Sequence, residues 1–264
     1  MLLKKLAIVL TVAFSVPAFA ATQTWNVNTS TNGNSNGNTV TANSGGLGLT
    51  VKAWSDTGGG SDNVIRSARL VKYGSGLGAI NRDEAANNQT SAPQHSIDSK
   101  DYSGSDGQDY EFVSLNFTEA VNLSHIDIGW ATDSGGSINQ RFGDMSFAAL
   151  TGNVLNGNTW QNIVTNSTIW TNSIADVSTS GYQAIGSASI YSKVWLVGAY
   201  SSVFKSLGYT GYRNDGVKLA GLKTSTREGG GGEVPAPGSL LLLLIGLLAL
   251  YTYRNSSWGG SIRA

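Results

Sequence analysis

The chain of 264 residues contains no cysteine, only four prolines and two histidines, and its charged residues amount to just 13%. The absence of cysteine excludes disulfides, thiolate metal sites and a lipoprotein anchor attached through an N-terminal thiol. Basic and acidic residues balance to a formal net charge of zero. The chain therefore lacks the basic excess typical of nucleic-acid-binding proteins. We expect a polar, weakly charged surface and stability from packing and backbone hydrogen bonds.

The first 20 residues have the three parts of a secretory signal peptide. Two lysines give the positive start, residues 6–14 form a short apolar run, and Ala18 and Ala20 are the small residues of a cleavage site. The apolar run is shorter than the roughly 20 residues that span a membrane comfortably. We expect signal peptidase to cut after Ala20, so that Ala21 begins the exported chain.

Alternation of apolar and polar residues with a period of two predicts several β-strands after the signal. Leu47, Leu49 and Val51 give the first clear example. With the strand at 47–53, strands are expected at 64–73, 109–117, 121–130, 145–149, 160–165, 182–190, 193–200 and 217–223. Short strands separated by turns rich in Gly, Asn and Ser favour an all-β fold, an antiparallel β-sandwich of jelly-roll type.

The apolar phase slips by one residue within the strand expected at 121–130. Val121 and Leu123 have one parity, whereas the apolar residues from Ile126 onward have the other. An extra residue in one strand of an antiparallel pair produces such a slip. The sequence therefore predicts a β-bulge near Ser124.

The composition changes abruptly after Arg227. A Gly-rich linker leads into a segment with two prolines, an aliphatic run over 240–253 follows, and Arg254 ends it. As a helix this run would extend about 21 Å, which is short for a hydrocarbon core of about 30 Å.

This order of linker, proline-bearing motif, aliphatic helix and basic residue resembles the PEP-CTERM sorting signal of exosortase-dependent bacterial surface proteins. The residues that carry the resemblance are Val234, Pro235, Pro237, Gly238 and Arg254. Ala236 stands where the family usually has Glu. The resemblance implies an exosortase-like transpeptidase as a partner. It also implies transient anchoring in the inner membrane, followed by a place on the outer cell surface or in the extracellular matrix.

A second resemblance, to exosortase-dependent surface proteins of Gram-negative bacteria, covers residues 93–98, 109–117 and 126–130. It implies the same class and no particular chemistry.

The expected organisation has five segments. They are the signal peptide 1–20, the β-sandwich ectodomain 21–227, the linker and sorting motif 228–239, the short transmembrane sorting helix 240–254 and the cytoplasmic tail 255–264. An ordinary C-terminal membrane anchor is the alternative to sorting. A buried core helix is disfavoured because the aliphatic run has no polar face.

One acidic loop has the donor groups of a cation site. Asp98, Asp101, Asp106 and Asp109 lie in it, separated by Ser and Gly residues. Calcium takes about six to eight oxygen ligands of this kind, although the spacing does not match an EF-hand. Calcium is thus the one cofactor that the sequence suggests, and a plain acidic turn is the alternative.

No set of residues predicts catalysis. The segment 133–136, Asp-Ser-Gly-Gly, follows His95 and Asp98 in the chain order of a trypsin-like triad, but the residues around them lack that family's pattern. A hairpin turn explains the segment better. His95 and His125 are the only histidines and lack a spacing that would place them together around zinc. We expect no enzyme.

These observations favour an exported, exosortase-processed cell-surface or extracellular-matrix protein without catalysis. The alternative is a secreted carbohydrate-binding module that acts on envelope or matrix polysaccharide, because exposed aromatic rings stack on sugars. Trp25 and Trp54 flank polar loops, whereas Trp130 and Trp195 are expected in the core. Packing in the core or at an edge is the default expectation for all of the tryptophans. Neither hypothesis includes nucleic acid as a partner.

Overall fold

The computed structural model of the chain describes residues 21–28, 37–56, 63–81, 95–99, 109–132, 142–208 and 215–227, together with the helical pair Gly246 and Leu247. The predicted signal peptide and sorting motif lie outside these residues, as does the predicted membrane helix apart from that pair. Asp101 and Asp106 of the predicted calcium loop also lie outside them. In the part of the chain that is described, no helix has the length and apolar character needed to cross a membrane.

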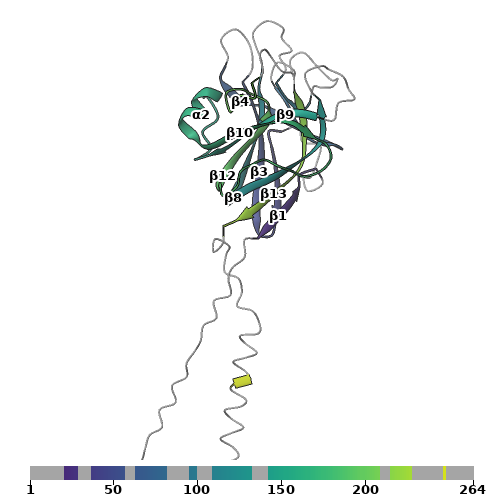
Figure 1. The fold of residues 1–264 in the computed structure, drawn as a ribbon, viewed down its shortest axis with the longest axis vertical. Coiled ribbons are helices and arrows are strands. Elements are labelled where there is room, and N and C mark those ends of the chain that lie inside the picture. Colours follow the sequence, from purple (N-terminus) through teal and green to yellow (C-terminus); the bar gives the residue numbers. More distant parts are fainter. Residues whose placement is uncertain are drawn as a thin grey trace, which may run out of the picture.

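The described residues form mostly antiparallel β-sheet, which confirms the predicted all-β class (Figure 1). In chain order the elements are β1 (Thr22–Asn26), β2 (Thr39–Ser44), β3 (Leu47–Asp56), β4 (Ile65–Ser67), β5 (Arg69–Tyr73), β6 (Gly76–Ile80), β7 (Ile97–Asp98), β8 (Glu111–Thr132), β9 (Phe142–Leu150), α2 (Trp160–Ser167), β10 (Thr168–Ser178), β11 (Gln183–Ala184), β12 (Ser192–Ala199) and β13 (Gly216–Thr226).

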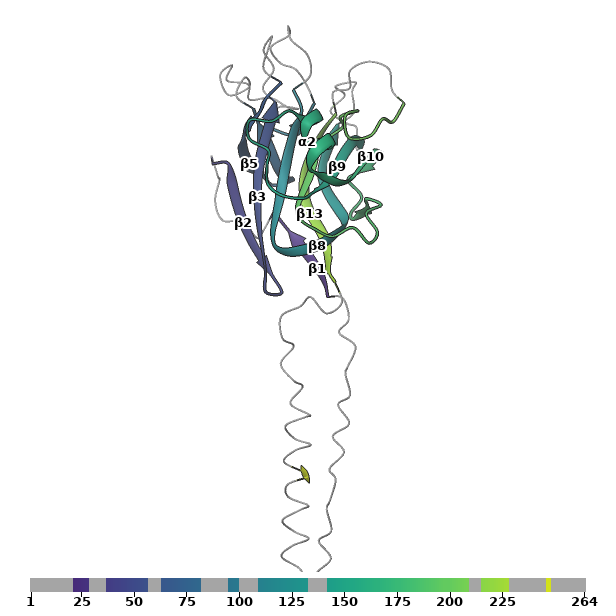
Figure 2. The same ribbon diagram turned by 90° about the vertical axis from the view of Figure 1, so that its left-hand side faces the viewer.

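Strand β8 is 22 residues long and pairs differently along its two halves. Residues 111–117 pair with β3 on one edge and with β12 on the other, and β9 and β10 continue the sheet beyond β12. Residues 121–132 pair with β13, which also pairs with β1, β6 and β7. The exposed residues 118–120 separate the two halves. One strand therefore belongs to both groups of strands (Figure 2).

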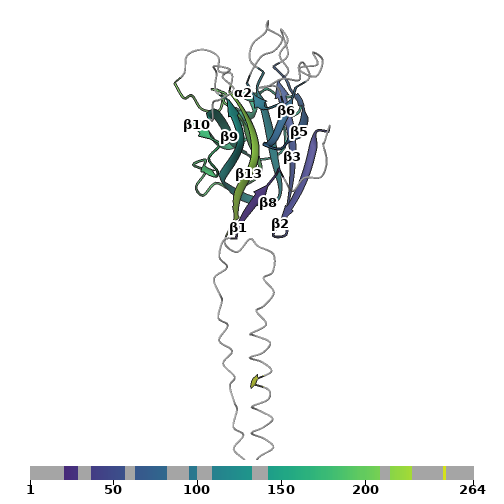
Figure 3. The ribbon, with the colours of Figure 1, turned by 90° about the vertical axis from the view of Figure 1, so that its right-hand side faces the viewer.

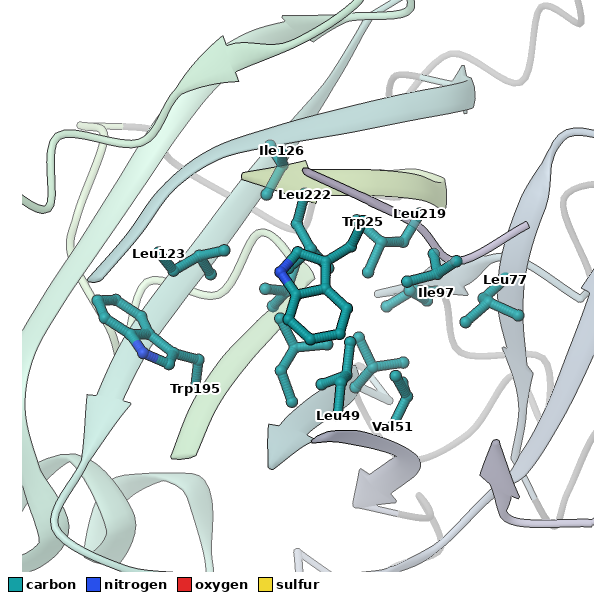
Figure 4. Packing of buried hydrophobic residues seen from close by; sticks show 14 of the residues in the cluster. Trp25, Leu49, Val51, Leu77, Ile97, Leu123, Ile126, Trp195, Leu219 and Leu222 are labelled. Carbon is teal, nitrogen blue, oxygen red and sulfur yellow. The ribbon is translucent and has the colours of Figure 1, made fainter. Parts of the chain in front are cut away.

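The main core contains side chains from both groups of strands, and Figure 4 shows part of it. The Trp25 ring on β1 packs edge-on against Phe117 on β8, with ring centroids 5.6 Å apart and planes 65° apart. The Trp25 indole Nε1 donates a hydrogen bond to the hydroxyl of Thr224 at 2.9 Å. Trp25 is only 2% exposed, which confirms the expected packing in the core. Trp195 is fully buried, as predicted.

A second apolar cluster covers the other face of the sheet around the first half of β8. The Phe112 ring lies 4.7 Å from the rings of both Trp160 on α2 and Phe204. Trp54 is buried in this cluster, as expected, and its indole Nε1 donates to Ser114 Oγ at 2.9 Å. Because apolar groups cover both faces, residues 111–115 are all buried.

The predicted bulge in β8 is confirmed. His125 pairs with Lys223 and Leu123 pairs with Thr224, so Ser124 is the extra residue between two consecutive pairs. Before this inserted residue the odd-numbered side chains of β8 point into the core, and directly after it the even-numbered ones do. The insertion therefore explains the slip in the apolar pattern.

A second bulge in β8 overturns the predicted position of Trp130. Trp130 pairs with Lys218 and Ile128 pairs with Leu219, so Gly129 is an extra residue. The shift places Trp130 beside Lys218, half-buried, whereas Ile128 is fully buried in the core. A Cβ atom at Gly129 would lie 1.8 Å from the carbonyl oxygen of Ser75, which explains why glycine occupies the bulge.

Residues 160–165 form part of helix α2, so the predicted strand there is wrong. The Thr159 hydroxyl accepts a hydrogen bond from the backbone N–H of Asn162 at 3.1 Å and caps the helix. Trp160 and Ile163 lie one helical turn apart, and both are buried. The strand predicted at 64–73 is divided at Ala68 into β4 and β5, which pair with β3 and β6.

Substituting Gly129 with alanine should destabilise the domain by about 2–4 kcal/mol, because the new methyl group would collide with the Ser75 carbonyl. Gly74→Ala is the matched control, since a Cβ atom at Gly74 would meet nothing within 4 Å. Chemical denaturation of both variants tests this expectation. Equal stabilities for the two variants would contradict the proposed close approach.

Candidate functional site

Six acidic side chains are buried at the end of the β domain where β3 ends and β13 begins. This end lies opposite to the one where β1 begins and β13 ends, and several connections between strands leave from it. Each of the six side chains is at most 6% exposed. We call them the loop-end carboxylates: Asp56, Asp98, Asp109, Glu111, Asp144 and Asp215.

Hydrogen bonds hold the first part of this set in place. The backbone N–H of Tyr110 donates to Asp56 Oδ1 at 2.6 Å and joins the end of β3 to the start of β8. The backbone N–H of Asp98 donates to Glu111 Oε2 at 3.2 Å and joins β7 to β8. The Ser96 hydroxyl donates to Asp98 Oδ2 at 3.0 Å. The carboxylates therefore bridge strand ends that are far apart in the sequence.

The remaining carboxylates connect β9, β10 and β13 in the same way. The backbone N–H of Asp144 donates to Asp215 Oδ1 at 3.2 Å. Asp144 Oδ1 in turn accepts the backbone N–H of Asp176 at 2.9 Å. The backbone N–H of Ser99 donates to the carbonyl oxygen of Asp215 at 3.0 Å. These contacts satisfy backbone donors at positions where the regular strand pairing ends.

The environment of Asp56 favours its protonated form. Burial raises the pKa of the Asp56 carboxyl from 3.8 to about 7. The N–H of Tyr110 and the Trp160 indole lower this pKa, but they do not offset the loss of hydration. The charge of Asp109 adds a smaller upward contribution. Asp56 therefore titrates near neutral pH in the folded domain.

Two of the four predicted calcium ligands are described, and both are fully buried. Asp98 lies on β7 opposite Gly216 of β13, and Asp109 comes just before β8, where its Oδ2 accepts from Asn81 Nδ2 at 3.4 Å. Within the described ranges, no group of three or more His, Asp or Glu side chains is arranged to hold a metal ion. Asp101 and Asp106 belong to the part of the loop outside those ranges. The calcium site stays a prediction.

Of the three residues that occur in the order of a trypsin-like triad, His95 and Asp98 are described, and both make other contacts. The His95 ring lies 5.8 Å from the Tyr73 ring, tilted by 30°. Asp98 accepts from the Ser96 hydroxyl and supports the strand ends. Ser134 lies outside the described residues. His125 follows the bulged Ser124, and its Nδ1 lies 2.9 Å from the Ser124 hydroxyl oxygen.

The loop-end carboxylates were only partly recognisable from the sequence. The sequence points to Asp98 and Asp109, because both belong to the acidic loop that predicts a calcium site. The carboxylates Asp56, Asp144 and Asp215 lie in three other segments. Glu111 did carry a usable signal, since it has the same parity as the buried Val113 and Leu115. A carboxyl group at a strand position that otherwise holds apolar, inward-facing residues indicates that the group is buried, in its ionised or its protonated form.

The chain was compared with protein-family models, with curated proteins and with solved structures, and none of them matches.

Substituting Asp56 with asparagine should alter how stability depends on pH. Because the folded pKa lies above the unfolded one, Asp56 contributes stability that is fully present below about pH 4 and is lost as pH rises to about 7. Asparagine keeps the acceptor for Tyr110 and removes the titration. The difference in free energy of unfolding between the variant and the wild type should therefore depend on pH. We expect it to be roughly 2–4 kcal/mol more favourable to the variant at pH 8 than at pH 4.

Denaturation of the wild type and Asp56→Asn at several pH values measures this difference. The exposed Glu119→Gln is the control for loss of a surface carboxylate. A variant with the same pH profile as the wild type would show that Asp56 is ionised normally.

Calcium binding by the acidic loop should raise the melting temperature, because a ligand bound only by the folded state stabilises it. We expect a chelator to lower the melting temperature of the wild type, and Asp101→Asn with Asp106→Asn to abolish that response. An identical melt with calcium and with chelator would leave this segment a plain acidic turn.

Proposed function

We propose that this chain is an exported, exosortase-processed surface protein without catalytic activity. In this proposal signal peptidase removes residues 1–20, the tail anchors the chain transiently in the inner membrane, and an exosortase-like transpeptidase then acts at the 234–238 motif. The β domain, an antiparallel sandwich of jelly-roll type, is the part displayed on the outer cell surface or in the extracellular matrix.

The pairing of the first strand with the last strand is the observation that carries the proposal. Thr22 on β1 lies opposite Ser225 on β13, and the backbone N–H of Thr226 donates to the carbonyl oxygen of Ala21 at 3.3 Å (Figure 3). The start and the end of the β domain are thus hydrogen-bonded neighbours.

This adjacency suits both processing events. A cut after Ala20 leaves β1 complete, including the buried Trp25, so the signal can be removed without loss of a core side chain. Arg227, the last described residue of the β domain, lies at the same end. A membrane anchor in the tail would therefore hold that end toward the bilayer and direct the loop-end carboxylates away from it.

The segment after the domain supports processing through its sequence. Glycines 229–232 give a flexible linker, and Pro235 and Pro237 favour an extended backbone that cannot join a following helix. Such a backbone is open to attack by an enzyme at the membrane surface. The aliphatic run that follows is short for a permanent span.

The mature protein should begin at Ala21 and, in a host with an exosortase, end between Val234 and Gly238. Mass spectrometry of the surface-associated chain measures both ends. The same measurement in a strain without the exosortase is the control and should find the tail retained. A chain that runs from Ala21 to Ala264 in both strains would favour an ordinary membrane anchor.

A further inference from the structure

Acidic and basic residues are separated between the interior and the surface of the β domain. Of the residues that the structure describes, six acidic side chains are the buried loop-end carboxylates, and three reach the surface, namely Glu119, Asp127 and Asp176. The described lysines and arginines are all half-buried or exposed: Lys52, Arg66, Arg69, Lys72, Lys193, Lys205, Lys218, Lys223 and Arg227. Although the chain has no net charge, the described surface is therefore basic.

Lys218 and Lys223 lie on β13 and Arg227 directly follows it, and each of these three cations contacts an aromatic ring. Lys223 Nζ lies 4.5 Å from the centre of the Tyr182 ring, and the Arg227 guanidinium lies 4.8 Å from the centre of the Tyr191 ring. Lys218 Nζ lies between two rings, 4.2 Å from the centre of Tyr73 and 4.9 Å from that of Trp130. We call the three cations and these four rings the β13 stripe.

The stripe lies on the face of β13 that points away from the main core. Leu219 and Leu222 are fully buried in the core, whereas Lys218 before them and the two cations after them are half-buried or exposed. At about 3.3 Å per residue, successive cations stand roughly 13–16 Å apart along the strand. The stripe thus follows β13 from the end with the loop-end carboxylates to the end where β1 begins (Figure 3).

Polar groups line the stripe. Thr24 on β1 pairs with Lys223, and Thr22 pairs with Ser225, which places exposed hydroxyl groups next to the cations. His125 on β8 pairs with Lys223 from the other side. Asp127 is the one acidic residue next to the stripe among those described, and its charge raises the pKa of the Tyr182 hydroxyl after the larger effect of burial.

We propose that the β13 stripe binds a linear acidic polysaccharide that lies along the strand. The cations pair with carboxylates of the sugar chain, ring edges contact the apolar faces of the sugars, and the threonine hydroxyls form hydrogen bonds with sugar hydroxyls. The rings also hold the cations in place, which reduces the side-chain entropy that is lost on binding. This inference does not depend on export or on sorting.

The spacing of the cations favours a polysaccharide over a nucleic acid. Each strand of double-stranded DNA carries a phosphate about every 3.4 Å along the helix axis, so most of its charges would have no partner on a stripe with this spacing. A polysaccharide in which only some sugars are acidic carries its charges farther apart.

Binding of hyaluronate, in which only every second sugar carries a carboxylate, to the full-length chain in detergent micelles tests this proposal. We expect binding at about 50 mM salt that weakens as salt is added, and no binding of the neutral glucan dextran. Lys218→Gln, Lys223→Gln and Arg227→Gln together should lower the affinity at least about tenfold. The control variant carries Lys52→Gln, Arg66→Gln and Lys205→Gln, which remove the same charge from other strands and loops, and its affinity should stay within about twofold.

Melting temperatures establish that the variants are folded. If loss of Lys218 prevents folding, the double variant Lys223→Gln and Arg227→Gln replaces the triple one, and Lys223→Arg with Arg227→Lys should restore binding. Equal losses in the stripe and control variants would overturn the proposal, because general charge would then explain binding. Absence of wild-type binding would overturn it too, as would tighter binding of single-stranded oligo-dT than of hyaluronate.

Discussion

Strand β8 is shared by two groups of strands, and the rest of the domain is arranged around it. Its first half is the partner of β3 and β12, and its second half is the partner of β13 and β11. Val113 and Leu115 from the first half belong to the same buried cluster as Ile126 and Ile128 from the second. The chain has no disulfide to join the two groups of strands, so this continuous strand and the shared core hold them together.

The two bulges of β8 decide what each face of the domain presents. The insertion at Ser124 keeps apolar residues pointing inward on both sides of the bend. The insertion at Gly129 has the opposite effect on Trp130, which is placed beside Lys218 at the outer face. The first bulge therefore maintains the core, and the second one supplies a ring to the β13 stripe.

For Asp56 the hydrogen bonds only partly offset the cost of burial, so the pKa of its carboxyl is raised. A carboxylate removed from water needs donors, and the loop-end carboxylates find several of theirs in backbone amides of neighbouring strand ends. Their burial leaves the basic residues as the main charges of the described surface. Although the sequence has no net charge, the described part of the surface is thus basic.

The alternation in β3, the buried Trp195 and the bulge at Ser124 could be predicted from the sequence, because each of them leaves a local pattern of apolar residues. The strands β1, β2 and β10 could not, since their polar Thr, Asn and Ser residues resemble those of loops until partners pair with them. The sequence of helix α2 also predicts a strand, because so short an apolar segment fits both the helical and the strand period. The N-terminal cap at Thr159 favours the helix.

The all-β class, the absence of disulfides and the inward phase of the strongest strands follow from the sequence alone, because composition and two-residue periodicity express them directly. The joint burial of the carboxylates, the outward position of Trp130 and the contact of each cation of the β13 stripe with an aromatic ring arise only in the folded domain. These features depend on pairing between segments as distant as Tyr73 and Lys218, and on the insertion at Gly129, which the apolar pattern does not register.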